Sequence, residues 1–190
     1  RRMHSPQLSQ PLVQMTANSH AAPHAANMQR FLYLLDGTAQ LDQSRLTQGD
    51  FAYLPAHLPH QLSSGNGCRL QLFEKPYQPT PLSDDLPQPI SGHAWAGEGE
   101  PFMGDEAARL RTLLPTDLAY DMAVNLFTFQ PGTALPFVET HVLEHGLYLL
   151  EGQGIYRLDD GWYPIQAGDT IWMGPYCPQW FCAIGKTQST

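Results

Sequence analysis

The sequence is poor in charged residues, and poorest in basic ones. Asp, Glu, Lys and Arg make up 15% of the 190 residues, and 18 acidic side chains outnumber 10 basic ones, which gives a net charge of −8. This balance argues against nucleic acid or an anionic membrane as a partner. No apolar run approaches the length of a membrane span, so no membrane partner is expected.

Cysteine is also scarce. The three cysteines, Cys68, Cys177 and Cys182, show no framework spacing, which is typical of reduced and mostly buried thiols. A disulfide or zinc site built on Cys177 and Cys182 is the alternative. It is disfavoured because no second cysteine pair accompanies this one.

Glycine and proline are abundant by contrast. The 16 Gly and 17 Pro separate many short apolar runs, a pattern typical of an all-β protein. Closely spaced prolines from residue 76 onward predict a linker without regular structure up to about residue 99. The single predicted helix spans residues 105–114, with Asp105 and Glu106 in its first turn, leucines on one face and Pro115 after its end.

Two stretches of the chain repeat. Residues 31–37 (FLYLLDG) parallel residues 146–152 (GLYLLEG), and residues 49–55 (GDFAYLP) parallel residues 168–174 (GDTIWMG). An internal repeat determines architecture more firmly than any single element, and here it suggests two small β-barrels in tandem. The expected parts are an N-terminal barrel over residues 1–76, a linker with the short helix over residues 77–117, and a C-terminal barrel over residues 118–190.

Glu139, His141 and His145 are separated by even numbers of residues. Side chains alternate faces along a strand, so an extended or gently interrupted strand would point all three to one side. Such a set in a barrel mouth could hold a catalytic metal with coordination positions left open. A lone His-x3-His pair is more often two ordinary polar residues. The acidic neighbour, the strand context and a second motif ending at Gln179 favour the metal site.

These residues lie within two glycine-bounded motifs: Gly132-x6-Glu139-x-His141-x3-His145-x6-Gly152 and Gly168-x5-Gly174-x4-Gln179. The motifs resemble the paired motifs of the cupin superfamily, except that Glu139 stands at the usual first histidine, His145 at the usual glutamate and Gln179 at the usual last histidine. With residues 152–158 and 162–169, this departure resembles the (S)-ureidoglycine aminohydrolase family, bicupins of purine catabolism. The similarity is densest from about residue 113 to residue 187.

The resemblance implies a bicupin, with tandem barrels or jelly rolls, and a manganese ion held by Glu139, His141, His145 and Gln179. Ligand chemistry agrees, because two imidazoles and two oxygen donors without a thiolate favour an octahedral Mn²⁺-like ion, although affinity alone does not exclude Zn²⁺, Fe²⁺ or Ni²⁺. The N-terminal repeat carries other residues at these positions: Arg30 for His145, Ala26 for His141, His24 for Glu139 and His60 for Gln179. That barrel is expected to have lost its ligand set and to serve packing and assembly.

The activity implied by the resemblance is hydrolytic deamination of (S)-ureidoglycine, a small-molecule ureide, to (S)-ureidoglycolate and ammonia. Glu139 is the candidate catalytic residue, as a ligand that also carries a proton. Tyr156 and Gln179 are candidate substrate-binding residues, and Tyr156 is equally well an ordinary tyrosine of the barrel wall. A homo-oligomer is expected, in the cytoplasm if the protein is bacterial and in the endoplasmic reticulum if it is from a plant.

Two other functions remain open. Another metal-dependent cupin enzyme, a dioxygenase or an isomerase, could use Glu139, His141 and His145 as a two-His-one-carboxylate face with Gln179 as a substrate contact. Dependence on O₂ would distinguish the dioxygenase. A non-catalytic small-molecule binder is the other alternative. It is weakened because the sequence has no helix-turn-helix or basic patch that would couple binding to DNA.

Overall fold

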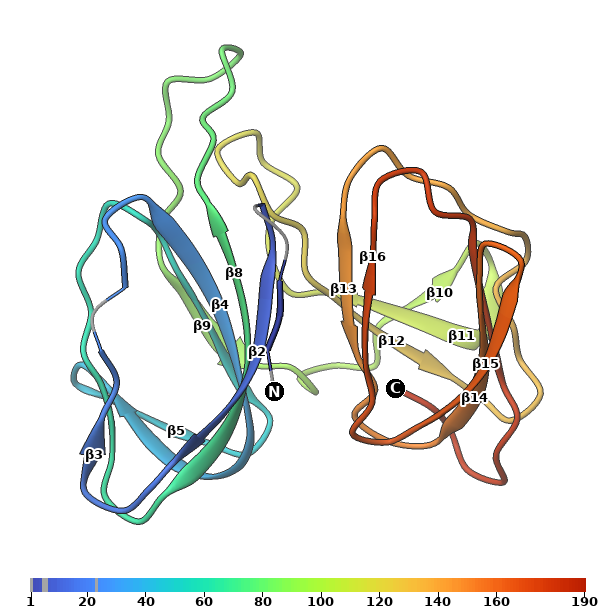
Figure 1. Ribbon diagram of the computed structural model, residues 1–190, viewed down its shortest axis with the longest axis horizontal. Helices are drawn as coiled ribbons and strands as arrows, with labels where there is room; N and C mark the ends of the chain where they lie inside the picture. The colour runs from blue at the N-terminus through green and yellow to red at the C-terminus, as the bar shows by residue number, and fades with distance from the viewer. Residues whose placement is uncertain (1, 5–6, 23) are drawn as a thin grey trace. The chain divides into compact units, whose positions relative to one another are not determined.

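The computed structural model describes residues 2–4, 7–22 and 24–190 (Figure 1). Within these ranges the chain forms strands and turns and no helix, so the predicted all-β class is confirmed. It follows that the described part contains no helix long and apolar enough to cross a membrane. The strands are β1 (Arg2–His4), β2 (Ser9–Met15), β3 (Ser19–His20), β4 (Met28–Leu41), β5 (Ser44–Thr47), β6 (Asp50–Leu54), β7 (Leu62–Ser64), β8 (Cys68–Pro76), β9 (Ile90–His93), β10 (Glu100–Phe102), β11 (Asp105–Thr112), β12 (Asn125–Phe129), β13 (His145–Tyr148), β14 (Gln153–Leu158), β15 (Gly161–Gln166), β16 (Thr170–Met173) and β17 (Gln179–Ala183).

The chain divides into two compact units. Unit 1 comprises Arg1–Ala96 and Leu113–Val124, and unit 2 comprises Gly97–Thr112 and Asn125–Thr190. Each unit is therefore assembled from two separate stretches of sequence. The domain bounds expected from the sequence, at residues 76 and 117, stay a prediction.

Unit 1 is built around an antiparallel sheet with strand order β1-β2-β8-β4-β6-β9, and β3, β5 and β7 join off this path. The long strand β4 pairs with β5, β6, β7 and β8. Side chains alternate along β4, so Leu32 and Leu34 enter the hydrophobic core together with Leu54, Leu70 and other residues. Arg30 lies two residues before Leu32 and therefore shares this inward face.

Unit 2 contains three smaller sheets in the described residues, ordered β10-β11-β12, β13-β16 and β15-β14-β17. Its core brings Phe129, Tyr156 and Phe181 together with Ile171 and Met173. The Phe129 and Phe181 rings meet edge to face, with centroids 5.0 Å apart. β13, β14 and β17 thus place their inward side chains around one core, and they carry His145, Tyr156 and Gln179 of the candidate site.

The helix predicted at residues 105–114 is wrong. Asp105–Thr112 form β11, which pairs with β10 on one side and β12 on the other. Met103 and Gly104 join β10 to β11 with φ angles of 54° and 85°, as in the primed turns that suit tight hairpins. Pairing on both edges satisfies the backbone groups of β11 and overrides the local helix signals. The predicted irregular linker is likewise interrupted, because β9 pairs with β6.

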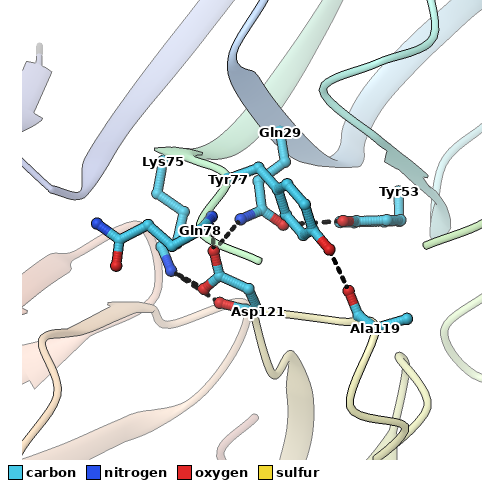
Figure 2. A network of polar contacts seen from close by, with 7 residues as sticks. All are labelled: Gln29, Tyr53, Lys75, Tyr77, Gln78, Ala119 and Asp121. Carbon is cyan, nitrogen blue, oxygen red and sulfur yellow. Dashed lines mark hydrogen bonds and ion pairs between the residues drawn. The ribbon is translucent and has the colours of Figure 1, made fainter. Parts of the chain in front are cut away.

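The segment Leu113–Val124 is anchored to strands of unit 1 through Asp121 (Figure 2). The Asp121 carboxylate accepts hydrogen bonds from Gln29 Nε2 at 3.0 Å and from the Gln78 backbone N–H at 2.6 Å, and it pairs with the Lys75 ammonium. Tyr53, which is completely buried, donates to Gln29 Oε1 at 2.8 Å. A carboxylate that is only 16% exposed thus has fixed donors for both oxygens, as a buried charge requires.

The two units share a strand register at the positions that the sequence repeat aligns. Arg30 faces Leu54 across β4 and β6, and His145 faces Met173 across β13 and β16. Two turn hydrogen bonds correspond as well: Gly49 N to Leu34 O at 2.9 Å and Gly168 N to Leu149 O at 2.8 Å. The main-chain pairing inside each unit therefore follows the repeat.

Candidate metal centre

Glu139 and Gln179 are brought together by a main-chain bridge. Each backbone N–H donates to the carbonyl of the other at 2.8 Å, and Gln179 then begins β17. Residues 140–144 lie outside the strands, and His145 begins β13. The predicted strand is therefore interrupted between Glu139 and His145. The Tyr176 backbone N–H donates to the His141 carbonyl at 2.7 Å and fixes the intervening loop.

The four predicted ligands and Tyr156 form one continuous chain of side-chain contacts. His141 Nε2 lies 3.4 Å from Glu139 Oε2, and the His141 and His145 rings have centroids 4.5 Å apart. Gln179 Nε2 lies 2.9 Å from His145 Nδ1, and the Tyr156 hydroxyl donates to Gln179 Oε1 at 2.7 Å. Sequence reasoning thus located residues that the fold brings together.

The protonation states of this cluster follow from burial. Burial and then the neighbouring His141 lower the pKa of His145, which keeps its imidazole neutral and able to donate a lone pair. Burial, followed by Glu139 and Cys177, raises the pKa of the Tyr156 hydroxyl. Tyr156 is therefore a hydrogen-bond donor at neutral pH and not a base.

The spacing of Glu139 and His141 is compatible with a shared divalent ion. Two ligands of one octahedral ion, each at about 2.1 Å, lie roughly 3 Å apart, close to the 3.4 Å between His141 Nε2 and Glu139 Oε2. The Glu139 side chain is 18% exposed, and His141 is its only side-chain hydrogen-bond partner among the described residues. A carboxylate that is this enclosed, and that has only one distant hydrogen-bond partner in the described part of the chain, is stabilised by a bound cation.

The donors nevertheless bond to one another as they stand. In the described part of the chain, no three His, Cys, Asp or Glu side chains form a group with the arrangement of a metal centre. His145 Nδ1 faces the Gln179 amide, and Gln179 Oε1 faces Tyr156. Gln179 is an oxygen donor outside those four residue types, and with it the set has two imidazoles, one carboxylate and one carboxamide.

Sequence reasoning missed two neighbours of the cluster. Met173 Sδ lies 3.5 Å from the Tyr156 hydroxyl, and Cys177 packs against the core cluster that contains Tyr156. The alternation Thr170-Ile171-Trp172-Met173 along β16, with Ile171 and Met173 buried, was the available signal for Met173. All three cysteines are free thiols, so Cys177 is not tied to Cys182.

No family model matches the chain. Curated relatives do: one from Oryza sativa subsp. japonica, named "Probable (S)-ureidoglycine aminohydrolase", is 40% identical over an alignment of 185 residues, and the match covers 94% of this chain. Relatives from Arabidopsis thaliana and Escherichia coli, both named (S)-ureidoglycine aminohydrolase, are 38% and 32% identical over 94% and 85% of this chain. Over most of its length, this chain is homologous to (S)-ureidoglycine aminohydrolases. It spans 58%, 60% and 64% of the three relatives, less than two thirds of each.

Solved structures agree with the fold. A protein from Pseudomonas aeruginosa described as glyoxylate-induced matches with a TM-score of 0.86 at 27% identity, over 96% of this chain and 71% of its own. Oxalate decarboxylase from Bacillus subtilis, in a structure described for its Mn(II) centres, matches with a TM-score of 0.72 at 14% identity, over 97% of this chain and 67% of its own. The second likeness shows a cupin-type β fold and no more.

Proposed function

We propose that this chain catalyses, as part of a ureidoglycine aminohydrolase, the manganese-dependent hydrolytic deamination of (S)-ureidoglycine to (S)-ureidoglycolate and ammonia in purine catabolism. The observation that carries the proposal is the cluster of Glu139, His141, His145 and Gln179 in a chain up to 40% identical to proteins with that name. In the net reaction, water supplies a hydroxyl to the substrate carbon, the carbon–nitrogen bond breaks, and the nitrogen leaves as ammonia.

Glu139, His141, His145 and Gln179 would hold the metal. When bound, a divalent ion supplies electrostatic activation of water or of the substrate carbon–nitrogen centre. Mn²⁺ suits the mixture of imidazole and oxygen donors. One carboxylate among four ligands leaves a net positive centre, which would attract the carboxylate group of ureidoglycine.

Residues of the protein would carry out the proton transfers of the reaction. Glu139 would accept a proton from the attacking water and pass it to the leaving amine, which makes it the catalytic residue of the proposal. Its enclosure, with a side chain 18% exposed, would limit exchange of that proton with bulk water. Gln179, with Tyr156 behind it, would form the wall against which the substrate binds.

Two architectural features belong to the same proposal. We infer a bicupin, one barrel in each unit, from the shared register at Arg30 and His145. We also infer a homo-oligomer, because large hydrophobic side chains on the segments around the site are exposed: Phe137, Val138, Val142, Leu143 and Tyr176. Sedimentation analysis that gave only a monomer would contradict the second inference.

The test is ammonia release from (S)-ureidoglycine generated in situ, with the chain loaded with Mn²⁺. Release above the spontaneous rate should disappear with a chelator and in Glu139→Ala. Glu106→Ala is the matched control, because Glu106 is a carboxylate of unit 2 with a side chain 72% exposed; it should keep the wild-type rate. A metal-loaded protein with no rate above background would overturn the substrate assignment.

A further inference from the structure

Gln179 is a buried amide with both ends engaged. It is only 4% exposed; its Oε1 accepts from Tyr156 at 2.7 Å and its Nε2 faces His145 Nδ1 at 2.9 Å. A neutral amide is oriented by a nearby cation less strongly than a charged carboxylate is. Its usefulness as a ligand therefore depends on hydrogen bonds that hold the side chain in place.

The Tyr156 hydroxyl is a fixed point for those bonds. Tyr156 lies on β14 and is 4% exposed, and it pairs with Phe181 of β17, whose ring centroid is 5.9 Å from its own. Met173 Sδ lies 3.5 Å from the same hydroxyl. A ring this buried, packed against Phe181 of β17 and Met173 of β16, has little room to move, so its hydroxyl oxygen is held in place by the core of unit 2.

We propose that Tyr156 is a positioning residue, whose hydroxyl holds the Gln179 carboxamide and thereby sets the affinity of the site for its metal. The hydroxyl serves either orientation of the amide. It donates to Oε1 as in this structure, and it accepts from the Nε2–H when Oε1 turns toward a cation. This inference rests on the proposed metal site and adds a residue that acts through a ligand instead of touching the substrate.

The experiment is a titration with Mn²⁺, in which free and bound ion are distinguished by EPR, on the full chain, three single variants and one double variant. Tyr156→Phe should weaken Mn²⁺ binding about tenfold or more, the usual cost of losing a partner of a ligand, and should change the EPR signature of the bound ion. Tyr163→Phe is the matched control, because Tyr163 faces Tyr156 across β14 and β15 and is 51% exposed. It should bind Mn²⁺ as the wild type does.

A double-mutant cycle with Gln179→Ala shows whether Tyr156 acts on metal binding by positioning Gln179 or by packing in the core. Gln179→Ala leaves three donors and weaker binding, and in that background Tyr156→Phe should have no further effect, because its partner is gone. A tenfold loss that persists in the Gln179→Ala background would overturn the proposal in favour of general disruption of the core. This comparison decides the question even if Tyr156→Phe lowers the melting temperature.

The Mn²⁺ titration distinguishes a failure of the proposed metal site from a failure of the positioning role of Tyr156. A wild-type chain that binds no Mn²⁺ removes the proposed metal site and this inference with it. A wild-type chain that binds Mn²⁺, with Tyr156→Phe equal to it in affinity and spectrum, removes this inference alone. In that case a raised KM in Tyr156→Phe would identify Tyr156 as a substrate contact.

Discussion

Unit 1 and unit 2 place different groups at the same register position. Arg30 faces Leu54 in one, and His145 faces Met173 in the other. Their partners correspond as well: Arg30 Nη1 lies 3.2 Å from His60 Nε2, and Gln179 Nε2 lies 2.9 Å from His145 Nδ1. The two clusters thus share a framework, and the difference between them is chemical.

The cluster in unit 1 contains its own cation. The Arg30 side chain is 9% exposed and bonds to Glu74 Oε1 through Nη2 at 2.6 Å and through Nε at 2.7 Å. His24 stacks on His60 with centroids 4.3 Å apart. Arginine stays charged at any physiological pH, so the Glu74 charge is permanently neutralised by the protein.

The cluster in unit 2 leaves its carboxylate without such a partner. No Lys or Arg side chain is among the described hydrogen-bond or ion-pair partners of Glu139, His141, His145 and Gln179. The comparison suggests that a guanidinium in unit 1 occupies the role that a metal ion would have in unit 2. The same strand framework can then hold a cluster whose carboxylate is neutralised by an arginine, as in unit 1. It can also hold a set of proposed metal ligands whose described partners include no protein cation, as in unit 2.

The largest expected effect comes from giving unit 2 the residue of unit 1. His145→Arg should abolish Mn²⁺ binding altogether, because a fixed positive charge beside Glu139 repels a divalent ion and replaces a donor. EPR-detected Mn²⁺ titration measures it. His57→Arg, at an exposed histidine of unit 1, is the control and should bind normally. Retained binding in His145→Arg would show that His145 is not a ligand.

The next largest effect is expected from breaking the Arg30–Glu74 ion pair of unit 1, which should lower the free energy of unfolding. Arg30→Ala leaves Glu74 buried without a partner and should cost about 3–5 kcal/mol of folding free energy, measured by urea denaturation. Arg45→Ala is the control, because Arg45 is an exposed arginine of the same unit; it should cost less than about 1 kcal/mol. Equal effects would contradict a structural role for the Arg30 cluster.

The enclosed carboxylates Asp121 of unit 1 and Glu139 of unit 2 should differ in how much they contribute to stability. Asp121 has fixed donors in Lys75, Gln29 and the Gln78 backbone, so Asp121→Ala should cost about 2 kcal/mol by stranding them. Glu139 has one contact at 3.4 Å, so Glu139→Ala should change the stability of the metal-free protein by less than about 1 kcal/mol. Urea denaturation in the presence of chelator measures both. A larger loss in Glu139→Ala would mean that Glu139 serves structure.

The sequence pointed to Glu139, His141 and His145 through their even spacing, as expected for one continuous strand. Residues 140–144 lie outside the strands, so it is the loop before β13, and not strand alternation, that brings the three side chains together. Gln179 is 34 residues from His145, and the aligned repeat and the family resemblance were what linked them. The contact of 2.9 Å between their side chains depends on the barrel and could not be read from spacing.

The predicted helix failed for a related reason. Residues 105–114 carry acidic residues early and leucines at helical intervals, and both signals are local. Strand pairing with β10 and β12 is not local, since Ala108 faces Phe129 from 21 positions away. The primed turn at Met103 and Gly104 carries no Asn-Gly or Asp-Gly signature, so the hairpin could not be read from the sequence. The partner of Arg30, Glu74, was missed similarly, because their pairing joins β4 and β8 across 44 residues.

The last expected effect is the pH dependence of stability that His60 contributes in unit 1. Burial, His24 and Arg30 lower the pKa of His60 from 6.5 to about 4, against weaker opposite effects of the Leu58 backbone and Asp42. The unfolded chain therefore takes up the proton first as the pH falls. The stabilisation is complete above pH 6.5 and is lost between pH 6.5 and pH 4, and it amounts to about 1–2 kcal/mol once solvent screening is allowed for.

His60→Gln, which copies the residue at the corresponding position of unit 2, should remove most of this dependence. Urea midpoints measured from pH 7 to pH 4 should fall steeply in the wild type and less in the variant. A residual slope should remain for two reasons. Burial also lowers the pKa of His24, with Arg30 adding to the effect and Glu74 opposing it. Burial and then His141 lower the pKa of His145 in unit 2. His57→Gln, at an exposed position, should follow the wild type. Parallel curves for His60→Gln and the wild type would mean that the Arg30–Glu74 pair alone holds the cluster, and that His60 contributes no proton linkage.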